Sequence, residues 1–143
     1  VVNATDPTKI MQFLASGITT GTTRTLTVPD RNGTMALQAN QTSVASSATP
    51  TPTGNYKENE LYITALAAGA TIAAPTGTAA NGNTLLIRIQ DNGTARALAF
   101  NAIFEAVGVI LPTTTILGKK MYIGCIYNST DTKWDVVVVN TEA

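Results

Sequence analysis

The strongest strand signal of the chain is Thr84-Leu85-Leu86-Ile87-Arg88-Ile89-Gln90. Its side chains fall on two faces, with Leu85, Ile87 and Ile89 on one and Leu86, Arg88 and Gln90 on the other. Because successive side chains of a strand point to opposite sides, this alternation predicts a β-strand that buries one face in a core. The turn sequence Asp91-Asn92-Gly93 follows, so we expect a hairpin in which residues 95–100 return beside the strand.

Similar short strands are predicted on both sides of this stretch. They span residues 61–66, 71–74, 120–128 and 133–140, with turns at residues 67–70, 81–83 and 128–131. Residues 101–107 are consistent with either a helical turn or a loop. Many short strands separated by turns favour an all-β fold, and specifically an antiparallel β-sandwich or jelly-roll-like head.

The last predicted strand is apolar on both faces, because four valines, Val136 to Val139, follow one another. In a parallel sheet such a run lies between helices, but no helix is predicted here. We therefore expect one face of this strand to contact the core and the other to contact a partner subunit.

The chain divides into three zones, at residues 1–38, 39–55 and 56–143. The first is too polar and too rich in Thr and Gly to build a core alone, and it holds three short predicted strands, at residues 9–14, 23–28 and 35–37. We expect it to wind around identical copies of itself as a short intertwined β shaft. The second zone, the proline-rich segment, is mainly Ser, Thr, Ala and Pro and is predicted to be an extended linker or a strap over neighbouring subunits. The third zone carries the core of the head.

Composition argues against several classes of function. Hydrophobic residues make up 44% of the 143 residues and charged residues only 13%, which indicates a folded chain with much of its surface hidden against other chains. Nine basic and nine acidic residues cancel, so no broad field attracts nucleic acid or an anionic membrane. There is no histidine, and the single cysteine, Cys125, is expected to be buried. No apolar run reaches membrane-spanning length, so no membrane insertion is expected, and the start at Val1 without Met predicts a fragment of a longer protein.

The first zone carries a specific sequence pattern. Its parts are DPTKIMQF at residues 6–13, GTTRTLTVPD at residues 21–30 and GTMAL at residues 33–37. Together they resemble the repeated shaft-to-head module near the C-terminal end of tailed-bacteriophage tail fibres. The third zone resembles the C-terminal head domain of many such fibres, through residues 61–68, 74–78, 82–89, 91–98, 101–104, 111–115 and 133–136.

This resemblance implies a homotrimeric head at the distal end of a tail fibre, carried on the virion and made in the cytoplasm of the bacterial host. The rest of the fibre would precede this chain. The expected partner is a bacterial cell-surface glycan or lipopolysaccharide, and host-receptor attachment is the leading function. The alternative is a structural trimerisation and folding domain, with receptor contact made elsewhere in the fibre or by a separate protein.

Two groups of side chains are candidates for binding a saccharide, in which an aromatic ring forms a platform and polar side chains bond the hydroxyls. The first group surrounds one turn: Tyr127, Asn128, Asp131 and Lys133. Against this interpretation, Tyr127 and Trp134 flank the same hairpin and are expected to pack together as a cross-strand pair.

The second group is Phe104 and Glu105 with Arg96, provided that residues 101–108 lie at the tip. In addition, Lys119-Lys120 could meet lipopolysaccharide phosphates, although two adjacent lysines are also typical of a solvated turn.

Catalysis, metal binding and a cofactor are not expected. Four carboxylates of the head could pair as acid and base: Asp91, Glu105, Asp131 and Asp135. Two of them, Asp91 and Asp131, are explained by their turns, and Asp135 alternates against core positions. The sequence has no EF-hand spacing and no cysteine cluster. A carbohydrate-active enzyme is the third candidate function, after receptor attachment and the structural domain.

Overall fold

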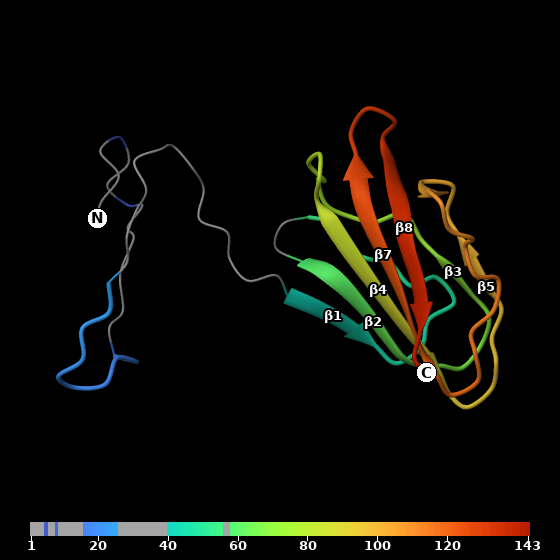
Figure 1. The fold of residues 1–143 in the computed structure, drawn as a ribbon, viewed down its shortest axis with the longest axis horizontal. Helices are drawn as coiled ribbons and strands as arrows, with labels where there is room; N and C mark the ends of the chain where they lie inside the picture. Colours follow the sequence, from blue (N-terminus) through green and yellow to red (C-terminus); the bar gives the residue numbers. More distant parts are fainter. Residues whose placement is uncertain (1–4, 6–7, 9–15, 26–39, 56–57) are drawn as a thin grey trace. The chain divides into compact units, whose positions relative to one another are not determined.

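The computed structural model describes residues 5, 8, 16–25, 40–55 and 58–143 (Figure 1). The chain forms two compact units, residues 1–34 and 35–143. In the first unit the described residues include a turn closed by a hydrogen bond from Thr22 N to Thr19 O at 3.0 Å. The strands expected at residues 9–14 and 35–37 lie outside the described residues. Of the strand expected at residues 23–28 only residues 23–25 are described, and they form no strand, so the intertwined shaft stays a prediction.

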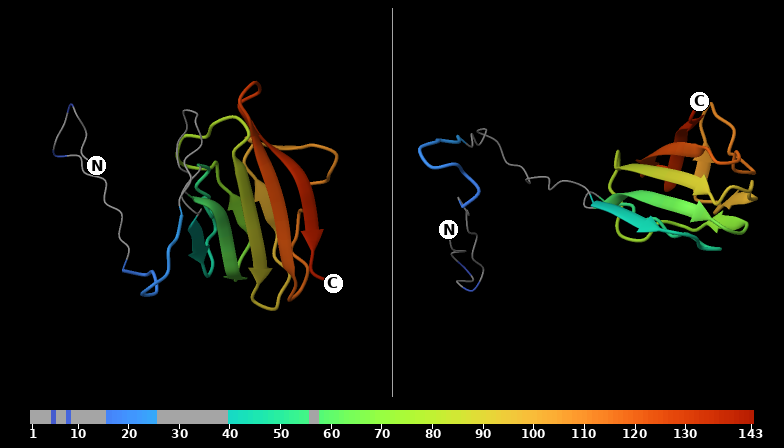
Figure 2. Two further views of the ribbon diagram at one scale, coloured as in Figure 1. Left: turned by 60° about the vertical axis from the view of Figure 1, so that its left-hand side comes forward. Right: turned by 90° about the horizontal axis from the view of Figure 1, so that it is seen from below.

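The described part of the second unit is built from strands, and no helix occurs in it. The strands are β1 (Asn40–Val44), β2 (Glu58–Leu66), β3 (Ala70–Ile72), β4 (Thr84–Asp91), β5 (Leu98–Phe100), β6 (Phe104–Ala106), β7 (Lys120–Asn128) and β8 (Lys133–Thr141). Six of them form one sheet in the order β1-β2-β4-β7-β8-β6, and β3 pairs with β5 in a second sheet. Figure 2 shows the long strands of the six-stranded sheet from two further directions. The prediction of an all-β fold is confirmed for the described residues.

Strand directions differ from the predicted antiparallel arrangement. Among the strand pairs of the described residues, β4–β7 and β7–β8 are antiparallel, whereas β1–β2, β2–β4, β6–β8 and β3–β5 are parallel. In three of the four parallel pairs, the two strands are not consecutive in sequence. The chain leaves β2, adds β3 to the second sheet, and only then enters β4, so it returns to the first sheet in the same direction.

The hairpin predicted after residue 91 is also wrong. Asp91 Oδ1 accepts hydrogen bonds from the N–H groups of Gly93 and Gly118, each at 3.0 Å, and Oδ2 accepts one from the Thr115 hydroxyl at 2.8 Å. These bonds hold the turn against the segment that precedes β7. The chain therefore continues into β5, which pairs with β3 rather than with β4.

Two other predicted features are confirmed. The alternation in residues 84–90 gives β4, where exposed or half-buried residues alternate with buried ones. The turn at residues 128–131 joins β7 and β8 in an antiparallel hairpin. Residues 101–107 begin with a turn, closed by a hydrogen bond from Phe104 N to Asn101 O at 3.0 Å, and Phe104–Ala106 then pairs in parallel with β8 as an edge strand, which was not predicted.

The core lies on one face of the six-stranded sheet and includes residues of the two-stranded sheet. Its buried members are Leu61, Ile63, Leu66, Ala70, Ile72, Leu85, Ile87, Ile89, Leu98, Phe104, Met121, Ile123, Cys125, Trp134 and Val136. We call the opposite face of the six-stranded sheet the outer face. Alternation within β2, β4 and β7 places every second side chain there.

The described part of the proline-rich segment is not a linker, because it belongs to the second unit. Its first residues form β1, beside β2, and its carbonyls at Pro50 and Pro52 accept hydrogen bonds from Ala73 N and Thr76 N, each at 2.9 Å. Both prolines are fully buried. Low hydrophobicity misled the sequence interpretation, since an extended chain with apolar proline rings and free carbonyls can still dock along a folded domain.

Candidate functional site

The predicted residues at the β7–β8 hairpin do lie together. Asn128 Nδ2 donates to Asp131 Oδ2 at 2.8 Å and to Asp135 Oδ2 at 3.3 Å, while Asn128 Oδ1 accepts from Thr130 N at 3.0 Å. Lys133 Nζ donates to the carbonyl of Ala102. These polar groups therefore spend much of their hydrogen-bonding capacity on the hairpin and its neighbouring loop.

The aromatic ring of this group faces the core side of the sheet. Tyr127 is the register partner of Trp134, with ring centroids 5.2 Å apart and planes inclined at 54°. Trp134 is only 2% exposed, and Tyr127 is half-buried against the core. The expected cross-strand aromatic pair is confirmed, and it leaves Tyr127 little ring surface for a ligand.

The second predicted group is not assembled. Phe104 is 5% exposed and meets Phe100 edge to face, with centroids 5.9 Å apart, so its ring is part of the core and not a platform. Glu105 is exposed on β6 beside Asp135. Arg96 lies elsewhere, because its N–H donates to Thr115 Oγ1 at 2.8 Å and its Nη2 to Asn92 Oδ1 at 2.9 Å.

Arg96 and Glu105 lie at opposite ends of the sheet. Thr115 and Gly118 precede the start of β7, whereas the hairpin near Glu105 follows its end. A nine-residue strand spans roughly 25 Å at about 3.3 Å per residue. One small saccharide cannot contact both side chains.

Asp91 is a buried carboxylate, 4% exposed, at the Arg96 end of the sheet. Burial by itself raises the pKa of this group, but hydrogen bonds from Gly118, Thr115 and Gly93, with the nearby charge of Arg96, outweigh it and hold the pKa below its ordinary value of 3.8. All of these partners belong to the chain segments that Asp91 joins. Its role is to fasten the turn after β4 to the segment before β7.

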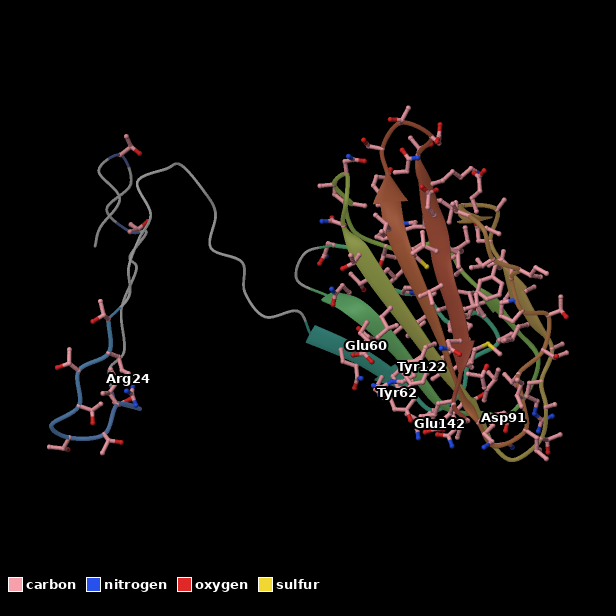
Figure 3. The ribbon with its side chains drawn as sticks, viewed as in Figure 1. Arg24, Glu60, Tyr62, Asp91, Tyr122 and Glu142 are labelled. Carbon is pink, nitrogen blue, oxygen red and sulfur yellow. The ribbon has the colours of Figure 1, made fainter. Side chains whose placement is uncertain are left out.

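The outer face carries a second cluster of polar and aromatic residues, which the sequence did not single out as a site. Tyr62, Arg88 and Tyr122 are register partners across β2, β4 and β7. The Arg88 guanidinium carbon lies 3.9 Å from the centroid of the Tyr62 ring, and its Nη2 lies 2.6 Å from Glu60 Oε1. Figure 3 labels Glu60, Tyr62 and Tyr122 on these strands. The only sequence signal was an arginine within the apolar stretch of β4.

A shallow depression of about 340 Å³ adjoins this cluster. Its lining residues are Asn59, Glu60, Thr84, Leu85, Leu86, Gly124, Cys125, Ile126 and Val137. Gly124 contributes no side chain, and a Cβ at this position would lie 2.6 Å from Cγ1 of Val138 on the adjacent strand. Glycine is therefore needed both for the packing of Val138 and for the space in the depression.

The chemistry of these surfaces suits binding better than nucleophilic attack. Burial raises the pKa of the Cys125 thiol to about 12, so the chain's only cysteine is a neutral thiol at physiological pH. Within the described ranges, no group of three His, Cys, Asp or Glu side chains is placed to hold a metal ion. In the same part of the chain, no helix has the length and hydropathy to cross a membrane.

Comparison of the chain with protein-family models, with curated proteins and with solved structures gave no match.

Proposed function

We propose that this chain is the receptor-binding distal end of a tailed-bacteriophage tail fibre, and that it attaches the virion to a surface glycan or lipopolysaccharide of a bacterium. The class of protein is suggested by the resemblance of residues 6–37 and of the head to such fibres. The structural observation that supports a binding role is the outer face, where an apolar depression lies beside the Glu60–Arg88 ion pair and Tyr62. In this proposal the two sheets form a sandwich-like head that acts without catalysis.

We propose that the head works as a homotrimer. Large apolar side chains are exposed away from the outer-face depression, with Val107 at 49% and Ile110 at 88%. Exposed apolar side chains of this size are typical of surfaces that contact another chain. Three heads on one fibre multiply weak single sites, because each further contact forms at high effective concentration.

A structural trimerisation domain is the second candidate function. It is favoured by the exposure of two more apolar side chains away from the outer-face depression, Ile116 at 51% and Leu117 at 61%. Subunit contacts would cover such residues, whereas a saccharide site would not need them. In this case the rest of the fibre, or a separate protein, would contact the receptor.

Two measurements on the intact chain test these proposals. Light scattering after size exclusion, repeated on dilution, gives the native mass, and a fluorescently labelled chain is tested for binding to a panel of bacterial strains. A mass of three chains with saturable binding that is lost when surface polysaccharide is stripped supports receptor attachment. A mass of three chains without binding to any strain contradicts it and favours the structural role. A monomer that binds no strain contradicts both.

A further inference from the structure

We infer that the depression on the outer face binds an uncharged sugar ring, and that Glu60 accepts hydrogen bonds from neighbouring hydroxyls of that sugar. The inference rests on the proposed function, because it assigns a ligand class and a position to the attachment site. It also differs from the site predicted at the β7–β8 hairpin, because the ring of Tyr127 faces the core side of the sheet, away from the depression.

The floor of the depression matches the apolar face of a pyranose. Leu86, Ile126 and Val137 present aliphatic groups, and Gly124 leaves the space between them open. The C–H groups on one face of a sugar ring can rest on such a floor and remove apolar surface from water. A volume of about 340 Å³ falls at the lower end of the range for small-molecule sites, about 300–1,000 Å³.

The rim supplies the polar groups that a sugar requires. Asn59, Glu60 and Thr84 line one side, and Asn59 Nδ2 lies 3.4 Å from Thr84 Oγ1. A hydroxyl group both donates and accepts, so an amide, a carboxylate and a hydroxyl together can satisfy neighbouring hydroxyls of one ring. The carboxylate is the strongest acceptor of the three, because hydrogen bonds to an ionised group are shorter and stronger than neutral ones.

Glu60 is held in place before any ligand arrives. Arg88 Nη2 contacts its Oε1 at 2.6 Å, so the second oxygen, Oε2, can serve a ligand. The guanidinium also stacks on Tyr62, and its Nε is buried without a hydrogen-bond partner among the described residues. Glu60 and Tyr62 thus hold the guanidinium in a position that leaves its Nε–H group without an acceptor among the described residues. A preorganised carboxylate loses less conformational entropy on binding.

The charge of the cluster selects against anions. Arg88 offsets part of the charge of Glu60, but only the carboxylate of this pair lines the depression. A phosphate or a sugar acid placed on the apolar floor would approach Glu60, and like charges repel most strongly where water is partly excluded. A neutral ring with adjacent hydroxyls has no such penalty.

Nuclear magnetic resonance of the chain tests the site, with carbon-13 in isoleucine methyl groups and tyrosine rings. The probes are the methyl glycosides of glucose, galactose, mannose and N-acetylglucosamine, each added in turn, with inorganic phosphate for comparison. We expect at least one glycoside to shift the signals of Ile126 and Tyr62. The signals of the exposed Ile116 and of Tyr127 should stay in place, and phosphate should not shift Ile126.

The substitution Glu60→Gln tests the role assigned to the carboxylate. It keeps the size of the side chain but removes the charge, so affinity for the active glycoside should fall by about ten-fold or more. Glu142→Gln is the matched control, because Glu142 pairs with Lys120 at 3.3 Å but does not line the depression. Urea unfolding and native mass show whether both variants keep the fold and assembly.

Four outcomes would overturn the inference. They are a shift of Tyr127 without Ile126, wild-type affinity in the Glu60→Gln variant, no shift with any glycoside, and contacts from a second copy to Ile126 in the assembled protein. The last would make the outer face a subunit interface. If the chain still binds bacterial cells in these cases, only the inference fails and the attachment site lies elsewhere. Loss of cell binding as well would remove the proposed function itself.

Discussion

Gly54 lies where the proline-rich segment crosses Trp134, and the substitution Gly54→Ala probes how tightly that crossing is packed. A Cβ atom at residue 54 would lie 2.4 Å from Cζ2 of Trp134 and 3.1 Å from Cβ of Pro75. Ordinary van der Waals contacts of a Cβ lie between 3.4 and 4 Å. The indole has no easy way to move aside, because it is 2% exposed and its other neighbours include Tyr127 at a centroid distance of 5.2 Å.

The size of the effect follows from the cost of overpacking a rigid core. Adding a methyl group to a well-packed core typically costs about 1–3 kcal/mol. Here the clash is about 1 Å inside the normal contact distance and involves a fully buried ring, so we expect the upper end, about 3 kcal/mol. With an m-value of about 2 kcal/mol/M, the urea midpoint should fall by about 1.5 M.

Fluorescence of Trp134, the only tryptophan of the chain, reports unfolding in urea at a fixed protein concentration. Gly69→Ala is the matched control, because a Cβ there would meet atoms of Ala97 at 3.6 Å, an ordinary contact. This control should change the free energy of unfolding by no more than about 0.5 kcal/mol. Equal midpoints for the two variants would show that the segment does not pack on Trp134, and would refute the assignment of residues 40–55 to the folded head.

Two further variants and one labelling experiment test the buried positions. Asp91→Asn should lower the free energy of unfolding at pH 7. Because the pKa of Asp91 in the folded protein lies below its ordinary value of 3.8, the wild-type advantage should persist above that pH and shrink as the pH falls through the folded pKa. An unchanged difference in urea midpoint between pH 7 and pH 2 would contradict this. Phe104→Ala should lower the free energy of unfolding by about 3–5 kcal/mol, since the ring is in the core. Unchanged stability in a urea titration would show that the Phe104 ring is not buried. Cys125, whose thiol pKa is raised to about 12, should not react with a thiol reagent at pH 8 until urea unfolds the chain, so rapid reaction of the native protein would disprove its burial.

The long strands were predictable because their periodicity is a local property. In β4 and β7 one face is buried and the other is not, so hydrophobic alternation marks both the element and its core face. The short strands lacked this signal. β1 reads Asn-Gln-Thr-Ser-Val and is held by backbone hydrogen bonds beside β2, which almost any side chain allows. The pairing of β3 with β5 covers three residues and joins segments that are distant in sequence, so no local sequence pattern predicts it.

The difference between local and long-range information also explains which candidate sites were predicted correctly. Tyr127 to Lys133 are close in the chain, so a turn was enough to predict that they lie together. Arg96 and Glu105 required knowledge of the path after Asp91, and the predicted hairpin gave the wrong path. Alternation placed Arg88 on the face opposite the core, but it could not say that Tyr62 and Tyr122 would be its cross-strand partners. Register between strands is set by the whole sheet, not by one segment.

The position of β8 has a consequence for how the head folds. β8 follows all other described strands in sequence, yet it lies inside the sheet between β7 and β6 and supplies Trp134 and Val136 to the core. β6 has no neighbour in the sheet until β8 is in place. Because parallel pairs such as β6–β8 join distant residues, loop closure must come before their contacts form, and domains of this kind refold on a timescale of roughly milliseconds to seconds. Nucleation at the β7–β8 hairpin, followed by docking of β6, is the folding order that this topology favours.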